Sequence, residues 1–182
     1  MAQRNQTARA GALCRVPIDR EHCPDFSWHE IACQRTGLIR PTVAMYQHMC
    51  RVQQLRWWWD APITVSGART PLHNATEGGG GFSQHLLFTG VTLAEMAVDN
   101  ELATMFATDL HFSLTSPRLE PYFPWRYGER KQRAIAVRMA AEHIETYAAG
   151  TNGVGLYDWG IHWDPRPNKA RWDERTFTAP EV

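Results

Sequence analysis

Two histidine-bearing segments lie far apart in this sequence, and a shared site requires a fold that brings them together. The first is a glycine run at residues 78–81 followed by Ser83-Gln84-His85. The second is the segment 160–164, which contains His162. Each histidine lies beside a loop that can hold it, and histidine is the commonest metal ligand in proteins. The two segments together predict a metal site.

The size and charge of the chain limit its class. It has 182 residues and a formal net charge of zero, so we expect one domain with its own core and no nucleic-acid partner. It has no run of about 18 apolar residues, so we expect no membrane span. Residues 1–11 lack the apolar stretch of a secretory signal, which favours synthesis in the cytoplasm.

Cysteine and tryptophan each leave two interpretations open. The cysteines, Cys14, Cys23, Cys33 and Cys50, form no C-x-x-C pair, which argues against a structural zinc site. They are reduced thiols if the protein stays in a cytosol, or two disulfides if it leaves a cell. The eight tryptophans fill the core or an interface, or else line a glycan or peptide groove.

Apolar periodicity predicts three helices, over residues 42–60, 92–109 and 129–147. The apolar residues of the first helix recur at spacings of three and four: Met45, Met49, Val52, Leu55 and Trp59. The second helix opens with a capping box from Thr92 to Glu95, and a similar box from Ser27 to Glu30 predicts a short helical turn.

The remaining segments predict strands and loops. We expect strands at 62–66 and 86–89 and a hairpin formed by 153–157 and 161–163. Residues 67–81 are expected to form a long loop.

The expected fold is a single α+β domain with a small antiparallel sheet and helices packed around it. Residues 1–24 are expected to be an extended arm, and residues 25–182 the domain. An insertion is expected around 91–128, whose part from residue 111 is rich in proline and aromatic residues.

The motifs together resemble those of the zinc D-alanyl-D-alanine carboxypeptidase and endolysin peptidase family, whose members cut peptide crosslinks of bacterial cell walls. The resemblance is carried by these segments: Ser66-Gly67-Ala68-Arg69, His73-Asn74, Ser83-Gln84-His85, His162-Trp163-Asp164 with Arg166, and Ala170-Arg171-Trp172. One departure is Ala68, which stands where the family has tyrosine.

The resemblance implies roles for individual residues. His85 and His162 would bind Zn²⁺, and Ser83 would line the substrate site. Arg69 would bind a substrate carboxylate or polarise a carbonyl, or would tie the long loop to the fold. Asp164, two residues from His162 on the same side of a strand, would orient that histidine or form a surface hydrogen bond.

The third ligand is where the chain departs from the family. The family has an aspartate seven residues after the first histidine, where this chain has Thr92. Ala97-Val98-Asp99 reproduces the family's Ala-x-Asp signature further on, so Asp99 is the preferred ligand. Glu95 lies four residues earlier on the same expected helix face and is the other candidate. Both acids are equally compatible with a solvated acidic stripe.

The general base is also displaced. Several branches of the family have an acid three residues before the last histidine, where this chain has Trp159. Asp158 is the nearest acid, and it either acts as the base or caps the hairpin turn.

The leading hypothesis is therefore a zinc-dependent peptidoglycan peptidase, encoded by a phage, that acts on the stem peptides of the cell wall. It would be made in the host cytoplasm and act at the cell wall or within a virion. The alternative is a catalytically inactive tail protein that binds virion partners through residues 1–24 and 111–128. A wall-binding module is a weaker hypothesis because the sequence has no aromatic repeat.

Overall fold

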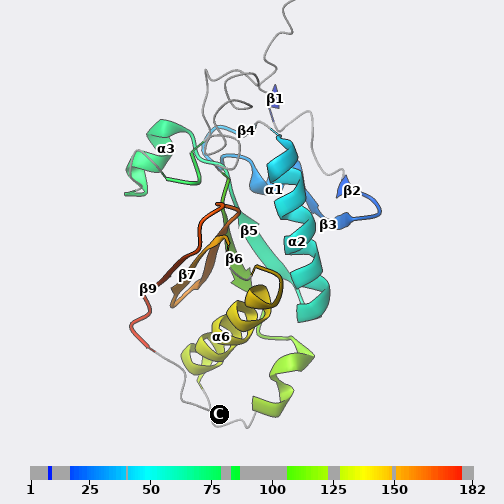
Figure 1. Ribbon diagram of the computed structural model, residues 1–182, viewed down its shortest axis with the longest axis vertical. Helices are drawn as coiled ribbons and strands as arrows, with labels where there is room; N and C mark the ends of the chain where they lie inside the picture. Colours follow the sequence, from blue (N-terminus) through cyan, green and yellow to red (C-terminus); the bar gives the residue numbers. More distant parts are fainter. Residues whose placement is uncertain are drawn as a thin grey trace, which may run out of the picture.

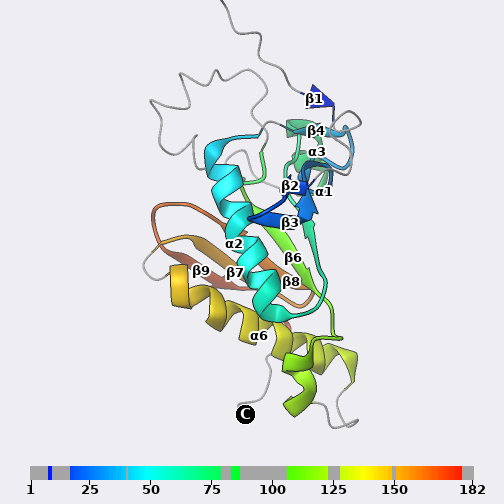
Figure 2. The ribbon, with the colours of Figure 1, turned by 90° about the vertical axis from the view of Figure 1, so that its right-hand side faces the viewer.

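A five-stranded sheet with two long helices on one of its faces forms the centre of the protein (Figures 1 and 2). The computed structural model describes residues 8–9, 17–39, 41–78, 83–86, 106–122, 128–148 and 151–177. The predicted α+β class is confirmed. None of the helices in these ranges is long and apolar enough to cross a membrane.

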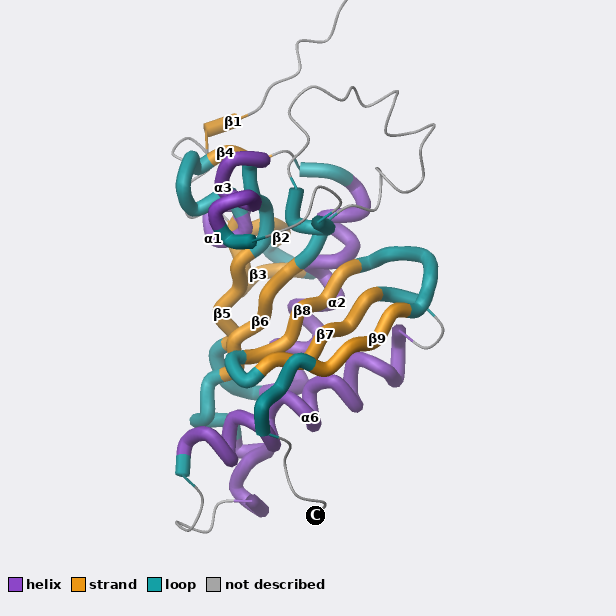
Figure 3. The backbone as a smooth tube through the Cα atoms, turned by 90° about the vertical axis from the view of Figure 1, so that its left-hand side faces the viewer, coloured by secondary structure: helices purple, strands orange, loops and turns teal. Residues whose placement is uncertain are grey.

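The sheet has the strand order β5-β6-β8-β7-β9 (Figure 3). Its strands are β5 (Ile63–Ser66), β6 (Thr108–Phe112), β7 (Gly153–Tyr157), β8 (Gly160–Asp164) and β9 (Ala170–Asp173). Neighbouring strands are antiparallel except β7 and β9, which are parallel. The predicted strand at 62–66 and the predicted hairpin at 153–163 are confirmed.

The two long helices are α2 (Val43–Trp59) and α6 (Glu129–Ala148), close to two of the predicted helices. Thr42 caps α2, because its Oγ1 accepts a hydrogen bond from the backbone N–H of Met45 at 3.1 Å. Asp60 ends that helix in the left-handed region with φ of 54°. The face of α2 identified from the sequence is buried, since Met49, Val52, Leu55 and Trp59 are each 0% exposed.

Alternation along the central strands separates the core from the site. In β6, Leu110 and Phe112 belong to the core on the helix side. Because successive side chains of a strand point to opposite faces, Asp109 points to the other face of the sheet. In β8, Ile161 and Trp163 are core residues, so His162 projects from that same other face. The register pairs Asp109 with His162, which places their side chains side by side.

Small elements cover one end of the sheet (Figure 1). They are β1 (Ala8–Arg9) paired with β4 (Leu38–Ile39), β2 (Pro17–Asp19) paired with β3 (Cys23–Ser27), and α1 (Trp28–Ile31). The capping box of Ser27 and Glu30 is confirmed, with Ser27 N donating to Glu30 Oε2 at 2.7 Å.

Three predicted segments differ from the structure. The extended arm was expected to reach residue 24, but a β-hairpin begins at Pro17, where Ile18 packs against the core. The loop expected at 67–81 contains the helix α3 (Pro71–Thr76), because Thr70 caps it and Pro71 suits a first helical position. Of the strand expected at 86–89, Leu86 forms an isolated bridge with Arg69, and the rest lies outside the described residues.

The prediction of a helix over 92–109 is wrong at the C-terminal end, which is the part that the structure describes. Residues 92–105, with the predicted capping box, lie outside the described ranges, but Thr108–Phe112 is strand β6 at the centre of the sheet. The polar residues Asp109 and His111 alternate there with buried Leu110 and Phe112, which is a strand period. The irregular segment expected from residue 111 begins after β6 and contains the 3₁₀ helix η2 (Pro117–Tyr122).

The structure decides part of the two questions that the sequence left open about cysteine and tryptophan. Cys23, Cys33 and Cys50 are free thiols, and the first two are fully buried. Cys14 lies outside the described residues. Trp59 and Trp163 fill the core, whereas Trp57 is 52% exposed on α2.

Candidate metal centre

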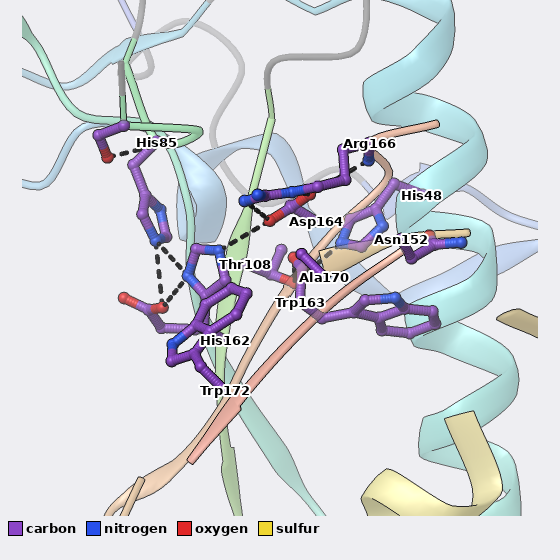
Figure 4. A network of polar contacts seen from close by, with 12 residues as sticks. His48, His85, Thr108, Asn152, His162, Trp163, Asp164, Arg166, Ala170 and Trp172 are labelled. Carbon is purple, nitrogen blue, oxygen red and sulfur yellow. Dashed lines mark hydrogen bonds and ion pairs between the residues drawn. The ribbon is translucent and has the colours of Figure 1, made fainter. Parts of the chain in front are cut away.

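His85 lies in the short described segment after the glycine run, and its ring is held from behind. Arg69 N donates to the His85 carbonyl oxygen at 2.7 Å, which fixes the backbone of this segment beside the loop after β5. The ring Nδ1 lies 2.7 Å from the carbonyl oxygen of Gly67. A carbonyl only accepts, so Nδ1 carries the proton and Nε2 keeps its lone pair. The ring is buried, and its Nε2 points toward His162 (Figure 4). The same nitrogen lies close to Asp109 Oδ1.

His162 is held in the same manner by a different acceptor. Its Nε2 lies 3.1 Å from Asp164 Oδ2, so Nε2–H donates to the carboxylate and Nδ1 keeps its lone pair. Asp164 is completely buried and also accepts from the Nε and Nη2 of Arg166, each at 2.7 Å. Burial alone would raise the pKa of Asp164, but the hydrogen bonds from His162 and Arg166 outweigh it and lower that pKa. Asp164 therefore remains an anion that fixes the His162 ring.

Asp109 supplies a carboxylate between the two histidines. Its Oδ1 lies 3.1 Å from His85 Nε2 and 3.2 Å from His162 Nδ1. Its Oδ2 accepts from Arg69 Nη2 at 2.7 Å, which turns Oδ1 toward the rings. Burial alone would raise the pKa of Asp109, but the hydrogen bonds to His162 and His85 outweigh it and lower that pKa.

The three facing atoms form a cluster that requires a cation. His85 Nε2 and His162 Nδ1 lie 3.0 Å apart, and Asp109 Oδ1 completes the triangle. With the outer N–H groups donated to Gly67 and Asp164, each neutral ring presents a lone pair to Asp109 Oδ1 and donates a hydrogen bond to it only when the ring carries a second proton. Such acceptors repel unless a proton or a metal ion lies between them. Ligand atoms about 2.0–2.1 Å from a tetrahedral zinc ion lie about 3.3 Å apart, so the cluster fits such an ion.

Protons and a metal ion would compete for this cluster. Burial alone would lower the pKa of His162, but the hydrogen bonds to Asp109 and Asp164 raise it overall. A nearby histidine, His48, is excluded from the cluster because it lies on the core side of β6. Its Nε2 contacts Thr108 Oγ1 at 2.9 Å, and burial lowers its pKa to about 3 (Figure 4).

A pocket of about 440 Å³ opens over the cluster. Among the residues that the structure describes, those that line the pocket are Arg69, Glu77, Ser83, Gln84, His85, Asp109, Tyr157, Trp159, His162, Arg166 and Trp172. The non-aromatic side chains of this lining are polar or charged, and the remaining ones are histidine, tyrosine or tryptophan. The site is therefore an open, polar pocket with an aromatic portion.

The structure brings together several of the residues singled out from the sequence. His85 and His162 meet at the cluster, and Arg69 and Ser83 line its pocket. Glu95 and Asp99 lie outside the described residues, so their prediction as ligands is untested. Asp158 lies in the turn between β7 and β8 and is not among the described residues that line the pocket. Its carboxylate instead accepts hydrogen bonds from Thr176 and from the backbone N–H of Phe177.

Sequence reasoning missed Asp109, although a signal was present. Ala107-Thr108-Asp109 repeats the Ala-x-Asp signature that had been assigned ten residues earlier. The alternating run from Thr108 to Phe112 would also have placed this aspartate on a strand. Extending the expected helix to residue 109 concealed this second match.

Comparison with known families agrees with the geometry. A model of the family described as Peptidase M15 matches residues 24–113, a span that contains Arg69, His85 and Asp109. Over these residues the chain is similar to the M15 peptidases. Peptidases of this family are metal dependent, and the buried cluster of His85, Asp109 and His162 can bind a metal ion. No curated protein matches the chain, and no solved structure matches it.

Proposed function

We propose that this protein is a zinc-dependent peptidase of the M15 type that hydrolyses the stem peptides of bacterial peptidoglycan. The observation that carries the proposal is the cluster of His85 Nε2, Asp109 Oδ1 and His162 Nδ1, whose separations are 3.0–3.2 Å. Three nitrogen and oxygen ligands with a fourth position open to a pocket are typical of catalytic zinc sites. The family match supports peptide hydrolysis as the reaction.

The residues around the cluster prepare it for this chemistry. A zinc ion bound there would act as a Lewis acid and lower the pKa of a bound water. Asp164, anchored by Arg166, holds the His162 ring in the tautomer that leaves Nδ1 free. Gly67 does the same for His85 through its carbonyl oxygen. Arg69 holds Asp109 and lines the pocket, where its charge favours a substrate carboxylate or a developing oxyanion.

The assignment of the general base changes with the location of Asp158. That carboxylate is engaged by Thr176 and Phe177, and it does not belong to the described lining of the pocket. Glu77 is the carboxylate that lines the pocket, besides Asp109, in the described part of the chain. Its side chain is 53% exposed and its Oε1 lies 3.6 Å from His73 Nε2. We therefore assign the base to Glu77.

The biological setting is part of the same proposal. Cell-wall stem peptides are the substrates that the sequence motifs imply, and an endolysin encoded by a phage would be made in the host cytoplasm and act on the wall. One of the grounds for the alternative, an inactive virion protein, is the departure from the family pattern at the third ligand. Asp109 supports the enzyme over that alternative, because it supplies a carboxylate at the position a third ligand requires.

A direct assay tests the function. Purified protein supplied with zinc is incubated with isolated peptidoglycan, and newly released amino groups and peptide fragments are identified by mass spectrometry. We expect fragments cut within the stem peptide or its crosslink, and loss of activity in His162→Ala and after chelation. Peptidoglycan left intact by zinc-loaded wild-type protein would contradict the proposal.

A further inference from the structure

The aromatic part of the pocket is a second feature of the site that metal binding does not explain. Tyr157, Trp159 and Trp172 line the same pocket as the histidine cluster. Each is only partly buried, unlike the core residues Trp59 and Trp163, which are 0% exposed. These three side chains therefore present ring surface to the pocket.

The three rings are held in place by one another and by the sheet. Trp172 Nε1–H donates to the Tyr157 hydroxyl at 2.8 Å. Tyr157 stacks on Trp159 with ring centroids 4.8 Å apart and planes 13° apart. His111 stacks on Trp159 in turn, with centroids 4.9 Å apart. Such mutual support preorganises the rings, so little freedom is lost when a ligand packs on them.

The aromatic group adjoins the metal cluster directly. The rings of Trp172 and His162 have centroids 5.3 Å apart (Figure 4). Gly155 of β7 makes this placement possible, because a Cβ at that position would overlap the Trp172 indole. A ligand that packs on the Trp172 ring therefore lies next to His162 of the cluster.

The composition of the pocket indicates the chemical class of the ligand. The described residues that line it include no aliphatic side chain, and the aromatic rings are accompanied by hydrogen-bonding groups such as Arg166, Gln84 and Glu77. A pyranose ring has this dual character, since its C–H faces are apolar and its edge carries hydroxyl and amide groups. An aliphatic peptide side chain would instead favour an apolar pocket. The volume of about 440 Å³ accommodates a ligand of this size.

We propose that Tyr157, Trp159 and Trp172 form a saccharide subsite that binds an N-acetylhexosamine ring of the cell-wall glycan next to the metal cluster. This inference rests on the proposed function and specifies its substrate as a peptide that is still attached to glycan. It also places the cleaved bond near the glycan end of the stem peptide.

Calorimetric titration of metal-free protein with tetra-N-acetylchitotetraose tests the subsite. We expect saturable binding that Trp159→Leu weakens about five- to tenfold, consistent with the loss of one aromatic contact. Trp159→Phe keeps a ring and should bind more tightly than Trp159→Leu. Trp57→Leu is the matched control, since Trp57 is exposed on α2, on the opposite side of the sheet, and it should bind like the wild type. Circular dichroism verifies that each variant is folded.

The outcomes separate this inference from the proposed function. Absence of saturable binding by the wild type, or equal affinity in Trp159→Leu and Trp57→Leu, would overturn the subsite even if the protein hydrolyses peptidoglycan. Saccharide binding that depends on Trp159 would support the subsite even if the zinc-loaded protein cleaves no peptide.

Discussion

Asp109 performs two tasks with the two oxygens of one carboxylate. Oδ2 is bound by Arg69, and Oδ1 faces the lone pairs of His85 and His162. The outer nitrogens of both rings are already donated to Gly67 and Asp164. Each side chain of the cluster is thus oriented by a partner behind it, which is how proteins preorganise metal ligands.

Substitution of two acids distinguishes the candidates for the general base. We predict that Glu77→Gln lowers kcat on peptidoglycan fragments by about a hundredfold or more, because a general base contributes roughly 10²- to 10⁴-fold. Zinc binding should be retained, because Glu77 is not part of the cluster. Asp158→Asn is the matched variant and should leave kcat within about threefold of the wild type. Steady-state kinetics with metal analysis decide the assignment, and the reverse pattern would restore Asp158 as the base.

Among the strands, two features form the site: side chains alternate between the two faces of the sheet, and β7 carries glycine where other side chains pack against it. Strand β6 places Asp109 opposite His162, and β7 carries glycine at 153 and 155 beneath Asp164 and Trp172. A Cβ at either position would overlap those side chains. The sheet therefore both presents the cluster and leaves room for the groups beside it.

Gly155→Ala tests this use of glycine. We predict a loss of about 1–3 kcal/mol in the free energy of unfolding, the typical cost of overpacking, because the added methyl must displace the Trp172 indole. Gly128→Ala is the control, since a Cβ there meets nothing within 4 Å. Urea unfolding of both variants measures the difference. Equal stability of the two variants would show that Trp172 does not lie against β7.

The ion pair between α6 and β9 predicts a pH dependence. Glu145 accepts a hydrogen bond from Arg171 and lies 3.5 Å from the Nζ of Lys169. The hydrogen bond from Arg171 lowers the pKa of Glu145 below its ordinary value of 4.5. A lowered pKa means that the pair stabilises the fold above about pH 4.5 and that this contribution is lost as the pH falls toward the folded-state value.

Comparison of wild type with Glu145→Gln tests this dependence. We predict that the wild type is more stable at pH 7 by a few tenths of a kcal/mol, a small value because the carboxylate is partly exposed. The advantage should shrink at pH 3.5. Urea unfolding at the two pH values measures it, and an advantage that grows toward low pH would contradict the assigned direction.

Elements with a strong local signal could be predicted from the sequence. The periodic helices α2 and α6 and the hairpin of β7 and β8 match the apolar spacing of their residues. Strand β6 was missed, although its five residues alternate, because the helical spacing of the preceding residues was extended into it. Its five residues are strand because Leu110 and Phe112 pack into the core while β5 and β8 pair on either side. Tertiary pairing of this kind outweighs local propensity.

At the scale of the whole molecule, the helices and the site lie on opposite faces of the sheet. The helices α2 and α6 cover one face (Figure 3) and bury the core. The cluster and its pocket are formed by side chains on the other face. The three proposed ligands of the cluster come from the turn before Leu86, from β6 and from β8. The motifs predicted two of these ligands, and the third was missed because its Ala-x-Asp signature at 107–109 fell within the expected helix.

Zinc content distinguishes Asp109 from Asp99 as the third ligand of the cluster. Purified wild type, Asp109→Asn and Asp99→Asn are loaded with zinc, dialysed and analysed by elemental mass spectrometry. We predict about one zinc per chain in the wild type and in Asp99→Asn, and its loss in Asp109→Asn, since Asp109 Oδ1 completes the cluster with His85 and His162. Zinc retained by Asp109→Asn but lost from Asp99→Asn, or absent from the wild type, would contradict the account.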